Sequence, residues 1–128
     1  MSFYQIKKMG FSLIELLMVL VIVSILTSVL YPSYKHYRNK VEQLEAQNIL
    51  LSLMQAQRLF YSQHHSFTLN LDDVLEYVEI DINREAYTFT AQTCDEGIIQ
   101  QCVELSAVPH DDENLTLSYN SRNDKTHW

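Results

Sequence analysis

The chain has one carboxylate inside a long apolar run, where a charged side chain is unusual. Glu15 is the only charged residue between Phe11 and Tyr31. An acidic side chain costs about 2.5–3.5 kcal/mol at the centre of a membrane helix, and less near its end, so it needs a partner. One candidate partner is its own helix, because Ser12 and Glu15 fit the S-x-x-E capping box that satisfies free amides of a first turn. Glu15 is also a candidate functional residue, because ionisable groups in membrane segments are rare and are usually functional.

The second reactive pair is Cys94 and Cys102, the only two cysteines of the chain. If Lys7 and Lys8 stay inside the cell and the apolar run crosses the inner membrane, both cysteines lie in the periplasm, where disulfides persist. A cysteine pair alone does not make a zinc site, and the neighbouring pair His64 and His65 lies far from both cysteines in the sequence. We therefore expect a Cys94–Cys102 disulfide and no metal site.

No pattern in the chain predicts an enzyme or a cofactor. We find no nucleophile with a neighbouring base in a known motif, no phosphate-binding loop and no cluster of histidines. Residues 62–128 contain 13 acidic and 3 basic residues, a net charge of −10, which repels phosphate backbones. Nucleic acid is therefore an unfavoured partner, except through a small local patch near Arg122 and Lys125.

The apolar run predicts a membrane helix that continues beyond the membrane. Phe11 to Tyr31 is 21 residues, about 31 Å as a helix, which matches the hydrocarbon core of a bilayer. Pro32 could end the helix, but helical periodicity resumes after it, so we expect one long helix, kinked at Pro32, over residues 11–61. Two apolar stripes follow this periodicity. The first contains Leu30, Tyr34, Tyr37, Val41, Leu44, Asn48 and Leu51, with Asn48 as its one polar member. The second, which we expect under a globular head, contains Ala46, Ile49, Leu53, Ala56 and Phe60.

The rest of the chain predicts a small head with strands. Residues 62–67 break the helical pattern, and residues 70–78 read as a short helix whose Asp72 and Asp73 favour its positive end. Alternating segments at 86–93, 101–108 and 115–119 predict strands. In the last of them we expect Leu115, Leu117 and Tyr119 to share the inner face. The fold class is α+β, with a three- or four-stranded antiparallel sheet covering the helix.

The N-terminal motif resembles a known family. Lys7-Lys8-Met9-Gly10 followed by Phe11-Ser12-Leu13-Ile14-Glu15 is similar to the leader and cleavage junction of type IV prepilins. The resemblance implies that a membrane-embedded peptidase cuts between Gly10 and Phe11 and methylates the new amine of Phe11. It also implies that Glu15 of an entering subunit neutralises that amine on a neighbour, and that the chain has the type IV pilin fold.

The head resembles minor pilins that assist the assembly of twitching pili. The similar residues are Tyr87 to Ala91, Leu115 to Leu117 and the terminal Trp128. In that group the second cysteine usually lies just before the terminal tryptophan, whereas His127 stands there in this chain. The cysteine pair is therefore shifted upstream relative to the family.

Together these features predict four segments and one main function. The segments are a removed leader (1–10), a transmembrane and filament-core helix (11–31), an amphipathic half of the helix (32–61) and a periplasmic head (62–128). The resemblance implies a minor pilin that promotes pilus assembly, and hence twitching motility, adhesion or DNA uptake. Its implied partners are other pilin subunits, the prepilin peptidase and the assembly platform of the inner membrane. The protein would be anchored in the inner membrane first and later lie in the surface pilus.

Two alternative functions are a type II secretion pseudopilin and a pilus-displayed binding module for DNA or a surface.

Overall fold

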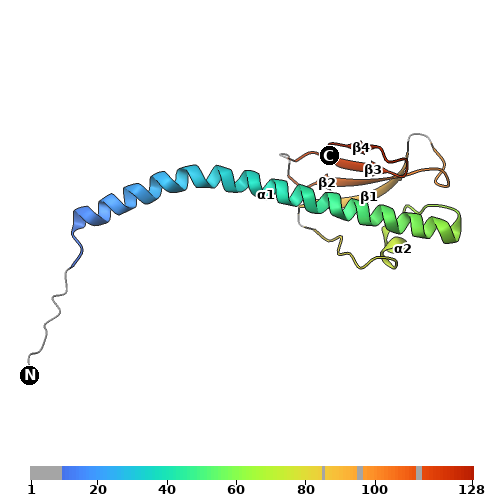
Figure 1. The fold of residues 1–128 in the computed structure, drawn as a ribbon, viewed down its shortest axis with the longest axis horizontal. Coiled ribbons are helices and arrows are strands. Elements are labelled where there is room, and N and C mark those ends of the chain that lie inside the picture. The colour runs from blue at the N-terminus through green and yellow to red at the C-terminus, as the bar shows by residue number, and fades with distance from the viewer. Residues whose placement is uncertain (1–9, 85, 95–96, 112–113) are drawn as a thin grey trace, which may run out of the picture. The chain divides into compact units, whose positions relative to one another are not determined.

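The computed structural model describes residues 10–84, 86–94, 97–111 and 114–128. Its elements follow the order α1, α2, β1, β2, β3 and β4 (Figure 1). The chain divides into two compact units, Met1–Arg38 and Asn39–Trp128. This combination of a long N-terminal helix and a small antiparallel sheet confirms the predicted α+β pilin-like class.

Helix α1 (Leu13–His64) has 52 residues and contains Pro32. The helix therefore does not end at this proline, and the kink there stays a prediction. At its C-terminal end α1 is three residues longer than we predicted, because Phe60 and His64 stack with ring centroids 4.2 Å apart and the Ser62 hydroxyl donates to the Leu59 carbonyl. The helix ends where His65 takes a left-handed conformation with φ 56°.

Helix α2 (Leu71–Leu75) is shorter than the predicted segment 70–78, but its start is capped as polar residues there suggested. The Asn70 side chain accepts from the Asp72 amide at 3.3 Å. The Asp73 carboxylate accepts hydrogen bonds from Thr68 and Asn70 side chains, at 3.0 and 3.2 Å. These bonds confirm that the aspartates serve the helix start.

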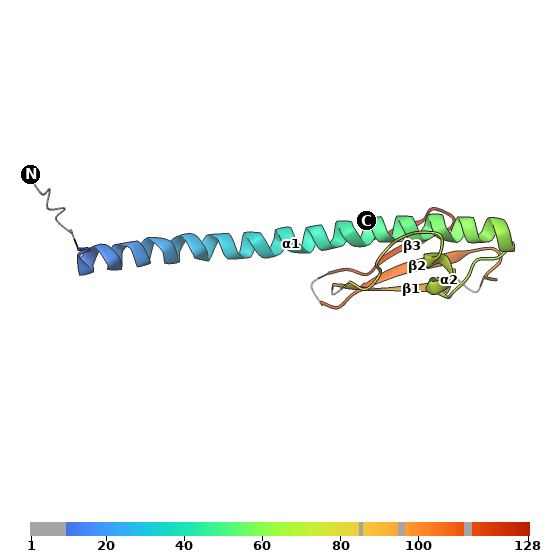
Figure 2. The ribbon, with the colours of Figure 1, turned by 90° about the horizontal axis from the view of Figure 1, so that it is seen from below.

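The sheet is an antiparallel meander in the order β1-β2-β3-β4, shown from a second side in Figure 2. Its strands are β1 (Tyr87–Thr93), β2 (Val103–Pro109), β3 (Leu117–Asn120) and β4 (Lys125–Thr126). One prediction was wrong: Leu115 precedes β3 and is 61% exposed, so it is not an inner-face residue. Leu115 lies in no regular element, and pairing with β2 begins only at Leu117.

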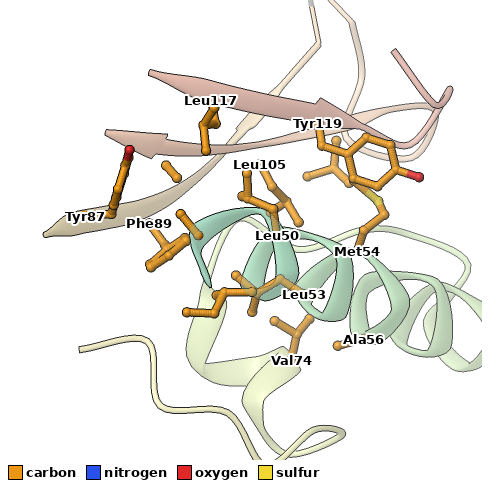
Figure 3. Packing of buried hydrophobic residues seen from close by; sticks show 14 residues of the cluster. Leu50, Leu53, Met54, Ala56, Val74, Tyr87, Phe89, Leu105, Leu117 and Tyr119 are labelled. Carbon is orange, nitrogen blue, oxygen red and sulfur yellow. The ribbon is translucent and has the colours of Figure 1, made fainter. Parts of the chain in front are cut away.

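The core lies between the head part of α1, the sheet and α2 (Figure 3). The second predicted stripe is its helical side, since Ala46, Ile49, Leu53 and Ala56 are buried and Phe60 packs against them. Inner-face residues of the strands complete it: Tyr87, Phe89, Val103, Leu105, Ala107, Leu117 and Tyr119. The first stripe stays exposed at Tyr34, Tyr37, Val41 and Leu44. Leu51, the last member of the first stripe, packs against the core, so the two stripes differ in environment only before this residue.

Candidate functional site

The residues around the proposed cleavage junction are exposed. Lys7 and Lys8 lie outside the described residues, so their placement stays a prediction. Gly10 and Phe11 precede α1, and Phe11 is 85% exposed. A Cβ atom built on Gly10 would meet no atom of the described residues within 4 Å, so their packing does not explain the glycine at this position.

Glu15 lies in the first turn of α1 and bends back towards the helix start. The Ser12 amide donates to Glu15 Oε2 at 3.1 Å, which is one half of a capping box. The structure therefore shows the capping contact that the sequence suggested. A carboxylate has about four acceptor sites, so this single bond leaves Glu15 able to accept from a further group.

The apolar half of α1 has the properties of a membrane segment. In the part of the chain that the structure describes, α1 is the one helix long and apolar enough to cross a membrane, and its most apolar stretch is not buried. Its hydroxyl groups bond to carbonyls of the same helix: Ser24 to Val21, Thr27 to Val23 and Ser28 to Ile25, at 2.7–2.9 Å. Self-contained bonds of this kind lower the cost of hydroxyls in hydrocarbon. Glu15 is thus the exceptional polar residue of the segment.

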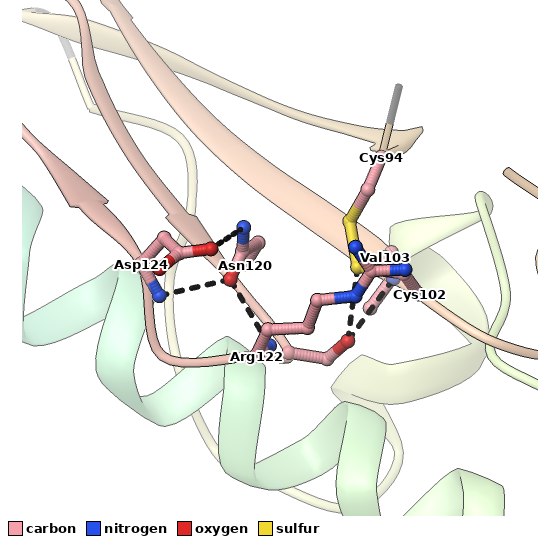
Figure 4. Close-up of a disulfide and its surroundings, with 7 residues drawn as sticks. Cys94, Cys102, Val103, Asn120, Arg122 and Asp124 are labelled. Carbon is pink, nitrogen blue, oxygen red and sulfur yellow. Dashed lines mark hydrogen bonds between the residues drawn. A yellow bond between two sulfur atoms is a disulfide. The ribbon is translucent and has the colours of Figure 1, made fainter. Parts of the chain in front are cut away.

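The predicted disulfide between Cys94 and Cys102 is present, with Cα atoms 5.5 Å apart. It joins the end of β1 to the residue before β2, and both cysteines are buried. Figure 4 shows it beside the turn after β3, whose Ser121 hydroxyl accepts from the Val103 amide at 3.3 Å and lies 3.4 Å from Cys102 Sγ. The disulfide therefore fixes the β1–β2 hairpin and contacts the next turn.

A second cluster, which sequence reasoning found only in part, surrounds the turn between β3 and β4. Asn123 Oδ1 accepts from Arg58 Nη2 and from the Tyr119 hydroxyl, both at 2.8 Å. Lys125 Nζ lies 4.2 Å from the ring centroid of Trp128 and 5.3 Å from that of Tyr119. The sequence singled out Lys125 with Arg122 but not Arg58, because Arg58 lies 65 residues from its partner and only the fold joins them.

The structure adds no metal site to these clusters. Among the described residues there is no group of three or more His, Cys, Asp or Glu side chains that could hold an ion. The acidic turn after β2 is described only at Asp111 and Asn114, since residues 112 and 113 lie outside the described part.

Comparison with protein families now gives two matches. Residues 32–117 match the family of the type IV minor pilin ComP, DNA uptake sequence receptor. The chain belongs to this family. Residues 8–31 match the prokaryotic N-terminal methylation motif, so the two matches together cover most of the minor pilin. The comparison with individual curated proteins gives no match.

Membership of this family fixes the general role of the chain. The chain is a minor pilin of type IV pili, a family with DNA uptake among its roles, and pilin families are structural rather than enzymatic. The methylation motif implies processing by a peptidase and assembly of a membrane-anchored precursor into a surface pilus. The individual roles of Gly10, Phe11 and Glu15 remain proposals.

Proposed function

We propose that this minor pilin is cut between Gly10 and Phe11 and then enters the pilus through charge pairing of Glu15. In this proposal the carboxylate of the entering subunit pairs with the N-methylated amine of Phe11 on a neighbour, and the chain promotes assembly. The observation that carries the proposal is Glu15 itself, a single carboxylate on an exposed apolar helix. A buried charge without a partner is strongly unfavourable, and an opposite charge on the neighbour would offset that cost.

The substitution Glu15→Gln tests the pairing. Glutamine also completes a capping box, so the helix start and membrane insertion should be preserved. Loss of one charge of a buried pair costs about 3–5 kcal/mol, so incorporation into pili should fall by well over tenfold. The measurement is the amount of the variant in membranes and in sheared pili of a deletion strain. Wild-type incorporation of Glu15→Gln would leave the residue as a helix cap and refute the pairing.

A separate deletion experiment distinguishes the pilus from a secretion pseudopilus. If the chain serves pilus assembly, its deletion should reduce surface pili and leave exoprotein secretion normal. Normal pili with lost secretion would support the pseudopilin alternative instead.

A second candidate function is DNA contact through the basic residues at the turn between β3 and β4, which are Arg122 and Lys125 of the turn and Arg58, which donates to Asn123 within it. The family description names a DNA uptake sequence receptor, whereas our sequence analysis did not favour nucleic acid as a partner. The charge of the head still argues against a broad basic face. A local contact remains compatible with it, because Arg58 and Lys125 both lie beside the Asn123 turn.

Salt dependence tests this candidate. Each lost phosphate contact lowers the slope of log affinity against log salt by about 0.9 on duplex DNA. The double variant Arg122→Gln with Lys125→Gln should therefore bind a duplex more weakly and with a slope smaller by about 1.8. Arg84→Gln is the control for the loss of one positive charge elsewhere in the head, and its slope should equal that of wild type. Equal slopes for wild type and the double variant would exclude DNA contact at these residues.

A further inference from the structure

The hydroxyl group of Tyr87 is buried without a visible partner. Tyr87 is 2% exposed, and its hydroxyl makes no hydrogen bond with any residue that the structure describes. Burial of a hydroxyl group without a hydrogen bond is unfavourable, so such groups in folded proteins nearly always bond to a protein group or to ordered water. The surroundings of Tyr87 indicate which of the two applies.

A small cavity borders this tyrosine, and four of its seven lining residues have polar side chains. Glu42 and Glu45 of α1 line it together with Arg84, Tyr87 and three apolar residues, and its volume is about 10 Å³. A buried water molecule needs about 10–15 Å³ and about two to four polar partners. The cavity therefore has the size for one water molecule, and four polar side chains surround it.

Two carboxylates of α1, those of Glu42 and Glu45, line the cavity and can accept a hydrogen bond there. Burial raises the pKa of Tyr87, and the negative charge of Glu42 raises this pKa further. The phenol is therefore neutral and keeps its proton to donate. Glu42 already interacts with another residue, but a carboxylate has about four acceptor sites and can accept one more bond.

We infer that one ordered water molecule occupies this cavity and bridges Tyr87 to Glu42. The water accepts a hydrogen bond from the Tyr87 hydroxyl and donates one to the Glu42 carboxylate. Glu45 and Arg84 offer it one further acceptor and one further donor. The bridge joins three segments of the head: α1, the connection before the sheet, and the first residue of β1.

A crystal structure of the processed full chain at a resolution that shows ordered water is the direct test. The expected result is one water molecule within hydrogen-bond distance of Tyr87 Oη and a Glu42 carboxylate oxygen. In the variant Glu42→Met this water should be lost, whereas Glu42→Gln should retain it because the amide still offers an acceptor. An empty cavity, or a direct bond between Tyr87 and Glu42, would overturn the inference.

Thermal unfolding of the full chain in detergent gives a second test. If the hydroxyl is bonded to water, Tyr87→Phe should lower the melting temperature by about 3–6 °C. If the hydroxyl has no partner, its removal relieves an unfavourable burial and should raise the melting temperature, which would contradict the inference. Tyr61→Phe is the matched control, because Tyr61 lies on α1 with 37% exposure and should show no shift.

Discussion

Buried polar residues of this head differ in whether the fold supplies their partners. Gln57 is fully buried, and its amide bonds to both backbone groups of Thr68, with the side-chain nitrogen 2.7 Å from the carbonyl and the side-chain oxygen 3.1 Å from the amide. It thereby holds α1 to the connection that follows. Tyr87 is equally buried but has no such bond in the described part of the chain. We therefore expect the stability of the head to depend on whether the Tyr87 hydroxyl keeps its proton.

The first prediction concerns alkaline pH. The pKa of Tyr87 is raised above its ordinary value of 10.0 in the folded state, so folding opposes its deprotonation. Its contribution to stability is complete below pH 10.0 and is lost as the pH rises from there through the folded pKa. The free energy of unfolding should fall above this pH, and fall less in Tyr87→Phe. Denaturant titrations of both proteins at neutral and alkaline pH measure this difference, and parallel losses would show that other groups cause the decline.

At the scale of elements, the sequence predicted the parts that depend on local periodicity. The exposure of most of the first stripe, the burial of the second stripe and the alternation of β1 were predicted correctly, because burial repeats along one helix or strand. In β2 the alternation is incomplete, since Leu105, Ser106 and Ala107 are all buried. Leu115 was misplaced, since its alternation with Leu117 does not show where pairing with β2 begins. The contact of Arg58 with Asn123 could not be found, because it depends on how distant segments pack.

A prediction at this scale concerns the β1–β2 hairpin. The Cys94–Cys102 disulfide closes a short loop, so by chain entropy its removal should destabilise the head by about 2–3 kcal/mol. The double variant Cys94→Ser with Cys102→Ser avoids a free thiol and should lower the melting temperature by about 10 °C or more. Wild type treated with reductant is the control and should match the variant. An unchanged melting temperature in both would show that the hairpin is held by its strand pairing alone.

At the scale of the whole molecule, the family and the fold class could be predicted from the sequence, whereas the segment boundaries depend on other molecules. Family membership and the α+β architecture are confirmed by the family matches and by the fold. The segment boundaries at residues 10, 31 and 61 stay predictions. Cleavage after residue 10 depends on a peptidase, and the end of the membrane segment at residue 31 depends on a membrane, so these two boundaries do not follow from contacts within the chain. The helix also continues across residues 31 and 61 without a break.

Processing is therefore best tested by substitution at Gly10. A Cβ atom at this position meets nothing within 4 Å in the described part of the chain, so Gly10→Val should leave the fold unchanged. The expected result is accumulation of an uncut precursor, whereas wild type should begin at N-methyl-Phe11. Mass spectrometry of the membrane-extracted proteins distinguishes the two, with the melting temperature of the head as a control. A Gly10→Val chain that is still cut before Phe11 would show that the peptidase does not require this glycine.

The strand order of the sheet also has a consequence for how the head reaches its native state. Each strand pairs with the next one along the chain, so no crossover has to be completed first. Low sequence separation between pairing partners is typical of rapid folding. The β1–β2 hairpin can form and oxidise by itself, and the later strands can add to its free edge in order. The slow, non-local step is then the docking of the assembled sheet onto the second stripe of α1. A chain tethered at its N-terminus would thus acquire a protected, covalently closed hairpin before its helix is covered.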